Sequence, residues 1–290
     1  MFPRYAASAC FVLLAAWFVA SLPASRPAQG AARTAEGKFS QEAEAAADAR
    51  KAQIEQEIRA LKAHPWAGSY YFGDGLGVNV YLALAPKSGF VFTWYGCLGL
   101  YDRNYGDLVE ENGHIRLVLT FPNKREGFEG IAPELIPVLW GERHYLIPSD
   151  GVVEFANAIN AGFEPRNRGS SSFLLKDGDE ERPVRGQPSI PAQYSAYLLR
   201  KPIAAHIVSV KESRKEGSCR ITIVLLDVGA DQGVLQDMEF YVRKPSSVFD
   251  CFEITSVEAS RSEAKIVQYL QDKSLPPGIG WKLSTRVMGD

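Results

Sequence analysis

Acidic side chains in the middle of the chain are the first residues whose type and spacing could support catalysis. Glu126, Glu129 and Glu134 fall in one short stretch. Glycoside hydrolysis requires two carboxylates that flank the scissile bond across a cleft. Acidic residues in an exposed loop are usually only solvated, so we interpret this stretch as a loop. A hydrolase of envelope glycan with an unidentified carboxylate pair remains the alternative function.

The other chemistry-bearing patterns are incomplete. The glycine-rich segment Gly73–Gly77 lacks the helix and the Lys-Ser or Lys-Thr pair of a phosphate-binding loop. Asp102–Gly113 begins like a calcium loop but has glycine at the fifth and twelfth positions. The 4 histidines do not have zinc-ligand spacing. We therefore predict no catalytic residue, no metal site and no cofactor, and we favour a protein that is not an enzyme.

Aromatic residues are the one compositional excess, and they cluster early in the chain. The cluster consists of Trp66, Tyr70, Tyr71, Phe72, Tyr81, Phe90, Phe92, Trp94, Tyr95, Tyr101 and Tyr105. Some of these rings must fill a core, but a tyrosine hydroxyl favours water or a ligand. We predict that a sugar or small apolar ligand binds Tyr81, Thr93, Tyr95, Tyr101 and Tyr105. The alternative is that all of these rings are core.

The elements that must position these residues are short strands. Over residues 65–163, runs with a period of two alternate with turn signals such as Asn112-Gly113. This pattern predicts an antiparallel meander that closes as a barrel or packs as a sandwich. Its predicted core contains Val80, Leu82, Leu84, Phe90, Phe92 and Trp94. A helix from Ser149 to Gly162 is expected to cover the meander.

The second half of the chain predicts another β module. Residues 164–191 are polar and rich in Gly, Ser and Pro, which indicates a linker. Residues 192–290 contain further strand-like runs and predict a small β-barrel domain. The predicted fold class is therefore mainly β, with a barrel or meander module, its covering helix and a second small barrel.

The N-terminus predicts export. Arg4 precedes an apolar run from Ala9 to Leu22, and Pro23 and small residues follow, so residues 1–32 fit a secretory signal peptide. An uncleaved anchor is the alternative. Residues 33–64 predict a disordered segment followed by a helical stalk, in which Ile54, Ile58 and Leu61 form a docking stripe.

The net charge restricts the classes of partner that this chain could bind, and the cysteines offer one candidate disulfide. The formal net charge of −2 provides no basic footprint for nucleic acid, and we expect no membrane span once the signal is removed. The unknown partner is then an envelope component or a small ligand, in the periplasm or outside the cell. Cys219 and Cys251 each adjoin a predicted strand and are the candidate disulfide; the alternative is that Cys97, Cys219 and Cys251 are all reduced.

Two short motifs resemble known barrel families. Trp66-Ala67-Gly68, ahead of a run of hairpins, resembles the start of calycin-type barrels (lipocalins and avidins) over residues 66–147. In that family the Trp-x-Gly motif opens the first strand and a basic side chain partners the Trp, which closes the barrel base. The resemblance implies an antiparallel barrel and no catalysis.

The second motif lies within Asp227–Val242. It resembles the strand–loop–strand of the small C-terminal β-barrel module of flagellar assembly protein T and related envelope proteins, over residues 204–286. Gly229, Gly233 and Val234 match the family's turn, whereas Asp237 stands where that pattern usually has glycine. Together these features predict an exported envelope protein that works by binding or assembly.

Overall fold

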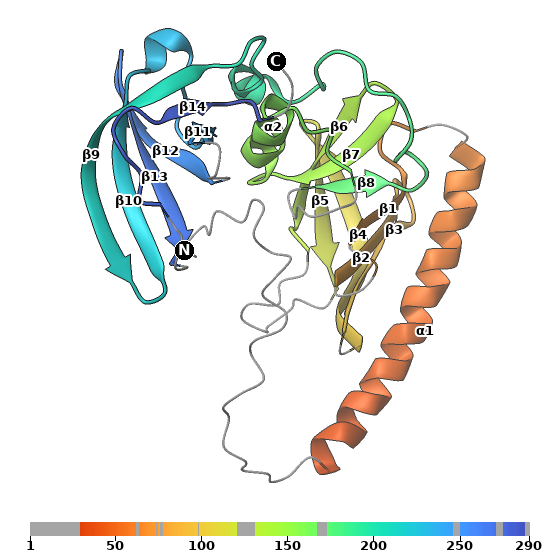
Figure 1. Ribbon diagram of the computed structural model, residues 1–290. Coiled ribbons are helices and arrows are strands. Elements are labelled where there is room, and N and C mark those ends of the chain that lie inside the picture. Colours follow the sequence, from red (N-terminus) through yellow and green to blue (C-terminus); the bar gives the residue numbers. More distant parts are fainter. Residues whose placement is uncertain are drawn as a thin grey trace. The chain divides into compact units, whose positions relative to one another are not determined.

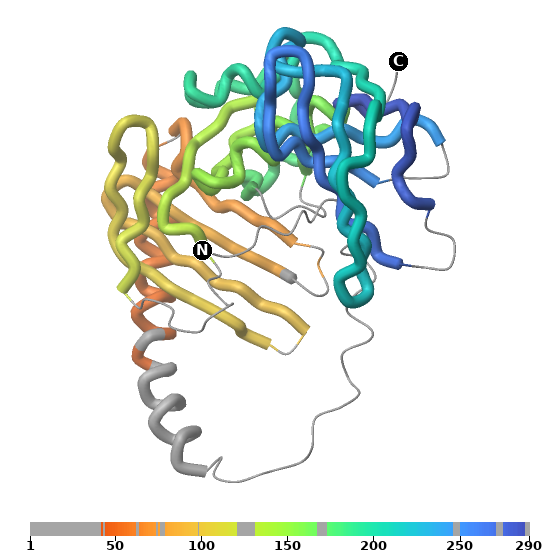
Figure 2. The backbone as a smooth tube through the Cα atoms, turned by 90° about the vertical axis from the view of Figure 1, so that its left-hand side faces the viewer, coloured from red at the N-terminus to blue at the C-terminus, as the bar shows by residue number. Residues whose placement is uncertain are grey.

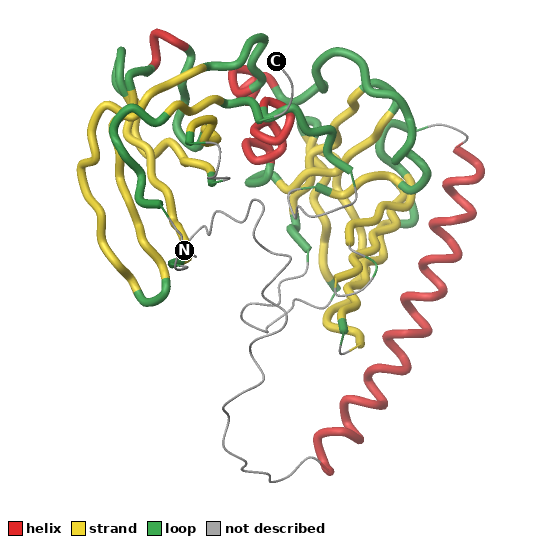
Figure 3. The backbone as a smooth tube through the Cα atoms, viewed as in Figure 1, coloured by secondary structure: helices red, strands yellow, loops and turns green. Residues whose placement is uncertain are grey.

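The computed structural model describes residues 30–61, 64–73, 75, 78–97, 99–120, 131–166, 173–245, 250–270 and 275–287. These residues are mainly strands, which form two closed antiparallel barrels (Figures 1 and 3). The predicted fold class is confirmed. Residues 1–29 of the predicted signal peptide lie outside the described residues. Within the described residues, no helix is both long enough and apolar enough to span a membrane.

The first barrel has eight strands in chain order, and Figure 2 shows the early ones side by side in orange to yellow-green. The strands are β1 (Gly68–Gly73), β2 (Val78–Ala85), β3 (Gly89–Gly96), β4 (Gly99–Glu111), β5 (His114–Leu119), β6 (Glu134–Trp140), β7 (Arg143–Pro148) and β8 (Leu174–Lys176). At the β4–β5 turn, Asn112 and Gly113 have φ of 53° and 76°. Two positive φ values are what a tight two-residue hairpin turn requires.

The predicted core of the first module is confirmed. Leu82, Leu84, Phe90 and Phe92 are buried together, and Val80 and Trp94 pack against them half-buried. The core is completed by Ile115, Leu117, Leu135, Leu146 and Leu174 from the other strands. Alternation sends every second side chain inward, so a sequence period of two was sufficient to identify this face.

The closing strand of the first barrel lies inside the segment predicted as a linker. Residues of β8 pair with Tyr70 and Tyr71 of β1 and with Tyr145 and Leu146 of β7. Phe173, Leu174 and Leu175 are buried. This placement corrects the linker interpretation of 164–191. Three residues suffice to close a barrel whose neighbouring strands already exist, but such a short run gives little periodicity in sequence.

Helix α1 (Gly30–Leu61) lies along the outside of the first barrel (Figure 1). Ile54 is fully buried among small side chains, Ala83 and Ala85 of β2 and Val91 of β3. Ile58 packs against the same cluster and Leu61 against the barrel core, so the predicted docking stripe is confirmed. The helix predicted as a stalk thus covers this barrel with the second half of its own length.

The second barrel has six strands in the order β10-β13-β12-β11-β14-β9. They are β9 (Ala204–Glu216), β10 (Cys219–Leu226), β11 (Glu239–Lys244), β12 (Cys251–Val257), β13 (Ser262–Tyr269) and β14 (Lys282–Ser284). Its core includes Val224, Leu226, Phe240, Phe252, Ile254 and Ile266. Period-two alternation again places these side chains on one face of each strand.

The loop that resembles the envelope module leads into β11 through a short helix, η3 (Ala230–Gln232). A Cβ added to Gly229 would lie 2.3 Å from the Glu258 carbonyl oxygen, so only glycine fits there. Asp237 has φ of 65°, the left-handed conformation that glycine favours. Aspartate tolerates this conformation better than most residues, which explains how it replaces the usual glycine.

Helix α2 (Val152–Asn160) was expected to cover the first module, but it belongs with the second barrel. The Asn157 side chain donates to the Asp237 carbonyl oxygen at 2.9 Å, and Asn160 donates to that of Tyr197 in η2 (Ala192–Tyr197) at 2.8 Å. Buried amides need such partners. The apolar periodicity of α2 predicted a buried helix without identifying which core it joins.

The described residues therefore divide differently from the predicted boundaries of 65–163 and 192–290. Among the described residues, one compact unit includes those within 30–149 and 166–189, and the other includes those within 150–165 and 190–287. The two units are thus interleaved in sequence, because α2 of the second barrel's unit comes before β8, the last strand of the first barrel.

Candidate binding surface

The outer face of β1–β3 carries a set of tyrosines and small polar residues. Tyr71, Tyr81 and Thr93 lie directly opposite one another on adjacent strands, and Asn79 is opposite Tyr95. Opposite residues in a sheet share a face. We call these five residues the tyrosine face. Tyr81, Thr93 and Tyr95 were predicted here, whereas Tyr71 was missed although its alternation with the inward-facing Tyr70 indicated the outer side.

The rings of the tyrosine face are accessible and held in place. Tyr81 is 46% exposed and Tyr95 is 45% exposed. The Tyr71 and Tyr81 ring centroids are 4.9 Å apart with planes inclined by 43°. The Tyr71 hydroxyl donates to the Asn79 side-chain oxygen at 2.6 Å. The arrangement presents ring surfaces together with hydroxyl and amide groups, which suits stacking combined with hydrogen bonding.

Tyr101 and Tyr105 were predicted in the same site, but the structure places them elsewhere. The pairing of β3 with β4 shifts between Trp94, which is opposite Asp102, and Tyr95, which is opposite Leu100, so Tyr101 lies at the bulge and its ring is 5.4 Å from that of Trp94. A bulge of this kind re-aims a side chain, and alternation alone does not reveal it. Tyr105 packs beneath α1, where the Arg50 guanidinium lies 5.8 Å from its ring centroid.

Helix α1 borders the tyrosine face. Arg103 of β4 is opposite Thr93 and so extends the row of Tyr71 and Tyr81. Its guanidinium forms an ion pair with Glu44 of α1 at 2.9 Å. Farther along, Arg50 donates to the carbonyl oxygens of Ser88 and Gly106. The docked helix therefore covers one part of the outer wall and leaves the tyrosine face open.

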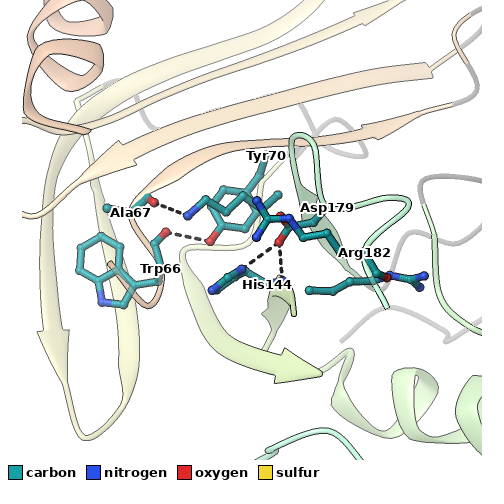
Figure 4. A network of polar contacts seen from close by, with 8 residues as sticks. Trp66, Ala67, Tyr70, His144, Asp179 and Arg182 are labelled. Atoms are coloured by element: carbon teal, nitrogen blue, oxygen red, sulfur yellow. Dashed lines mark hydrogen bonds and ion pairs between the residues drawn. The ribbon is translucent and has the colours of Figure 1, made fainter. Parts of the chain in front are cut away.

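A second polar cluster joins β8 to β1 and β7 (Figure 4). Asp179 is 1% exposed, it accepts a hydrogen bond from the backbone N–H of His144 at 2.8 Å, and it forms an ion pair with Arg182 Nε at 2.9 Å. Its carboxylate also lies 2.8 Å from His144 Nδ1. We call this cluster, with the Tyr70 and Lys176 contacts described next, the basal network.

The basal network also fixes the start of β1. Lys176 Nζ donates to the Ala67 carbonyl oxygen at 2.9 Å, and the Tyr70 hydroxyl donates to that of Trp66 at 2.8 Å (Figure 4). Burial lowers the pKa of Lys176, although Asp179 opposes this shift. Burial and the Asp179 charge both raise the pKa of Tyr70. These groups satisfy one another and the backbone, so we interpret the network as a device that closes the barrel.

The acidic and histidine candidates form separate pairs. His114 Nδ1 is 2.7 Å from Glu134, and His206 Nδ1 is 3.0 Å from Asp227. Glu126 and Glu129 lie outside the described residues. Within the described part of the chain, no three His, Cys, Asp or Glu side chains gather as metal ligands.

The predicted bridge between Cys219 and Cys251 is not formed, and both thiols are free. Cys219 pairs with Tyr269 of β13, and β13 separates β10 from β12, which carries Cys251. Two strand spacings amount to about 10 Å, whereas bridged cysteines need Cα atoms within about 7 Å. Proximity to strand ends in sequence did not reveal the intervening strand.

No protein-family model, curated protein or solved structure matches this chain.

Proposed function

We propose that this chain is an exported, non-catalytic protein of the cell envelope that binds glycan through the tyrosine face of its first barrel. The observation that carries the proposal is the exposure of Tyr81 and Tyr95 beside the polar side chains of Asn79 and Thr93 on one sheet face. Sugar rings offer apolar faces for stacking and hydroxyls for hydrogen bonds, so they match both kinds of group.

The basal network supports the resemblance to calycin-type barrels. In that family a basic side chain partners the Trp at the barrel base. Here Lys176 of the closing strand reaches the carbonyl oxygen of Ala67, next to the buried Trp66. In the second barrel, Asp237 in a left-handed conformation supports the likeness to the envelope-protein module. We assign that barrel an assembly or docking role.

Co-sedimentation with insoluble peptidoglycan tests the proposal. Tyr81→Ala and Tyr95→Ala should each weaken binding by up to about tenfold, because a stacked ring contributes roughly 0.5–1.5 kcal/mol. Tyr269→Ala is the matched control, since Tyr269 is 48% exposed on the second barrel. Equal retention of all three variants and wild type would overturn the proposal, and release of soluble sugar would favour the hydrolase instead.

An apolar ligand is the second candidate, and one observation favours it. Phe72, Val80, Trp94, Leu108 and Leu119 pack against the barrel core but remain half-buried. Inward apolar side chains that keep some exposure suit an apolar ligand at the end of the barrel interior. A fluorescent fatty acid tests this idea. Binding that Trp94→Ala removes and Tyr81→Ala leaves intact would favour the interior over the tyrosine face.

A further inference from the structure

One row of side chains on the inner face of the second barrel is polar. Thr222, Val224 and Leu226 of β10 are buried and point inward, so alternation places Arg220 on the same face. Arg220 is directly opposite Lys215 of β9 on one side and Gln268 of β13 on the other. We call Lys215, Arg220 and Gln268 the cationic row.

Neither cation of the cationic row has an ion-pair partner among the described residues. Like charges directly opposite in a sheet are destabilising, yet within the described part of the chain no carboxylate forms an ion pair with Lys215 or Arg220. The neighbouring Arg214, which faces the other way, is held by Glu212 at 2.5 Å and Glu216 at 2.7 Å. Arg214 on the outer face is therefore neutralised, whereas Lys215 and Arg220 have no carboxylate partner among the described residues.

The row also contains buried polar atoms without a partner. Gln268 is 4% exposed, and its Nε2 donates to Asp250 Oδ2 at 2.7 Å and to the Leu275 carbonyl oxygen at 3.2 Å. Both partners are acceptors, so the amide orientation is fixed. Gln268 Oε1 and Arg220 Nη1 then remain buried with no hydrogen-bond partner among the described residues. Unsatisfied buried groups of this kind are costly and rare in folded proteins.

We propose that the cationic row is a binding site for an oxyanion, a carboxylate or a phosphate, carried by a hydroxylated ligand such as a sugar acid or sugar phosphate. Arg220 Nη1 and Lys215 Nζ donate to the anionic oxygens, because charge-assisted bonds to oxyanions are the strong ones. Gln268 Oε1 accepts from a hydroxyl of the same ligand. This site lies in the second barrel and does not depend on the tyrosine face.

Calorimetric titration at constant ionic strength tests the proposal with four probes: inorganic phosphate, glucuronate, acetate and glucose. We expect glucuronate to bind more tightly than acetate, because acetate lacks a hydroxyl that could donate a hydrogen bond to Gln268 Oε1. Glucose, which has no anionic group, should not bind. Comparison of the affinities for phosphate and glucuronate shows whether the site prefers a phosphate or a carboxylate. Lys215→Gln and Arg220→Gln should each weaken binding at least about tenfold.

Arg214→Gln is the matched control, because it removes the same charge from the outer face of β9 and should bind like wild type. Lys215 is exposed, so its substitution keeps the test valid if Arg220→Gln does not fold. Equal binding by the Lys215 and Arg214 variants would overturn the proposal. Failure of wild type to bind phosphate and glucuronate would also overturn it and would indicate that the row holds only a bridging water.

Discussion

Two adjacent aromatic residues on β3 point to opposite faces of the first barrel. Trp94 points inward, where it packs against the core and against the Tyr101 ring at 5.4 Å. Tyr95 points outward and is 45% exposed. Successive residues of a strand face opposite sides, so the sequence alone was sufficient to assign these two rings to opposite faces.

Substitution of these rings should have unequal effects on stability. Trp94→Ala should lower the free energy of unfolding by about 3 kcal/mol, because it leaves a cavity beside the core. Tyr95→Ala should change it by less than about 1 kcal/mol, as exposed positions usually do. Thermal unfolding of both variants measures the difference. Equal destabilisation would show that the outer ring is also structural, and the tyrosine face would lose its proposed role.

Asp179 should be the most sensitive polar residue of the first barrel. Asp179→Asn removes the buried charge and replaces one of the two acceptor oxygens by an N–H donor, and Arg182 is half-exposed and can be solvated, so the cost should be about 1–3 kcal/mol. Asp177→Asn is the control. Burial and Glu180 raise the pKa of Asp177, so its loss of charge should be neutral or slightly stabilising. Chemical denaturation of the two variants should separate them clearly, and similar midpoints would contradict the closing role of Asp179.

At the scale of elements, periodicity identified the contact stripes but not all of their partners. The spacing of Ile54, Ile58 and Leu61 predicted one docking face on α1, and small side chains on β2 receive it. The core that α2 joins and the role of β8 in closing the first barrel were not predicted. Helix periodicity does not encode which core a helix joins, and three-residue β8 is too short to show alternation.

Docking of α1 should depend on Ile54. Ile54→Ala should cost about 3 kcal/mol of local stability, because a fully buried aliphatic side chain is truncated. Amide hydrogen exchange should then accelerate in α1 while the strands of the first barrel stay protected. Glu55→Ala, at the exposed next position, should leave exchange nearly unchanged. Faster exchange throughout the barrel in the Ile54 variant would show that helix and barrel unfold as one unit.

The same contact should weaken in acid. Glu57 of α1 accepts hydrogen bonds from the backbone N–H groups of Lys87 at 2.9 Å and Ser88 at 2.8 Å. Burial raises the pKa of Glu57, but these bonds, the Ser88 side chain and the Lys87 charge outweigh it, and the net shift is downward. A carboxylate with a lowered folded-state pKa stabilises docking above its unfolded value, about 4.3, and loses this contribution as pH falls through the folded value.

Hydrogen exchange in α1, measured from pH 6 to pH 3 and corrected for intrinsic rates, checks this prediction. Wild type should lose protection in the acid range, whereas Glu57→Gln should start with less protection and show a flatter pH dependence. Identical pH profiles for the two proteins would exclude Glu57 as the titrating contact.

At the scale of the whole molecule, two barrels were predictable but the path of the chain between them was not. Along the chain, α2 of the second unit comes first, and Arg166–Ser189 of the first unit follow it. Local patterns report the period and length of an element, whereas this interleaving depends on non-local pairing. The cationic row escaped prediction for the same reason, since Lys215, Arg220 and Gln268 become neighbours only through strand register.

Selective isotope labelling of tyrosine rings offers the most direct test of the central claim that the tyrosine face binds glycan. Titration of the labelled protein with soluble peptidoglycan fragments should shift the ring signals of Tyr71, Tyr81 and Tyr95, which share the outer face of β1–β3. The signals of the buried Tyr70 and Tyr145 should stay in place. No shift at all, or shifts that leave out Tyr81 and Tyr95, would contradict the account.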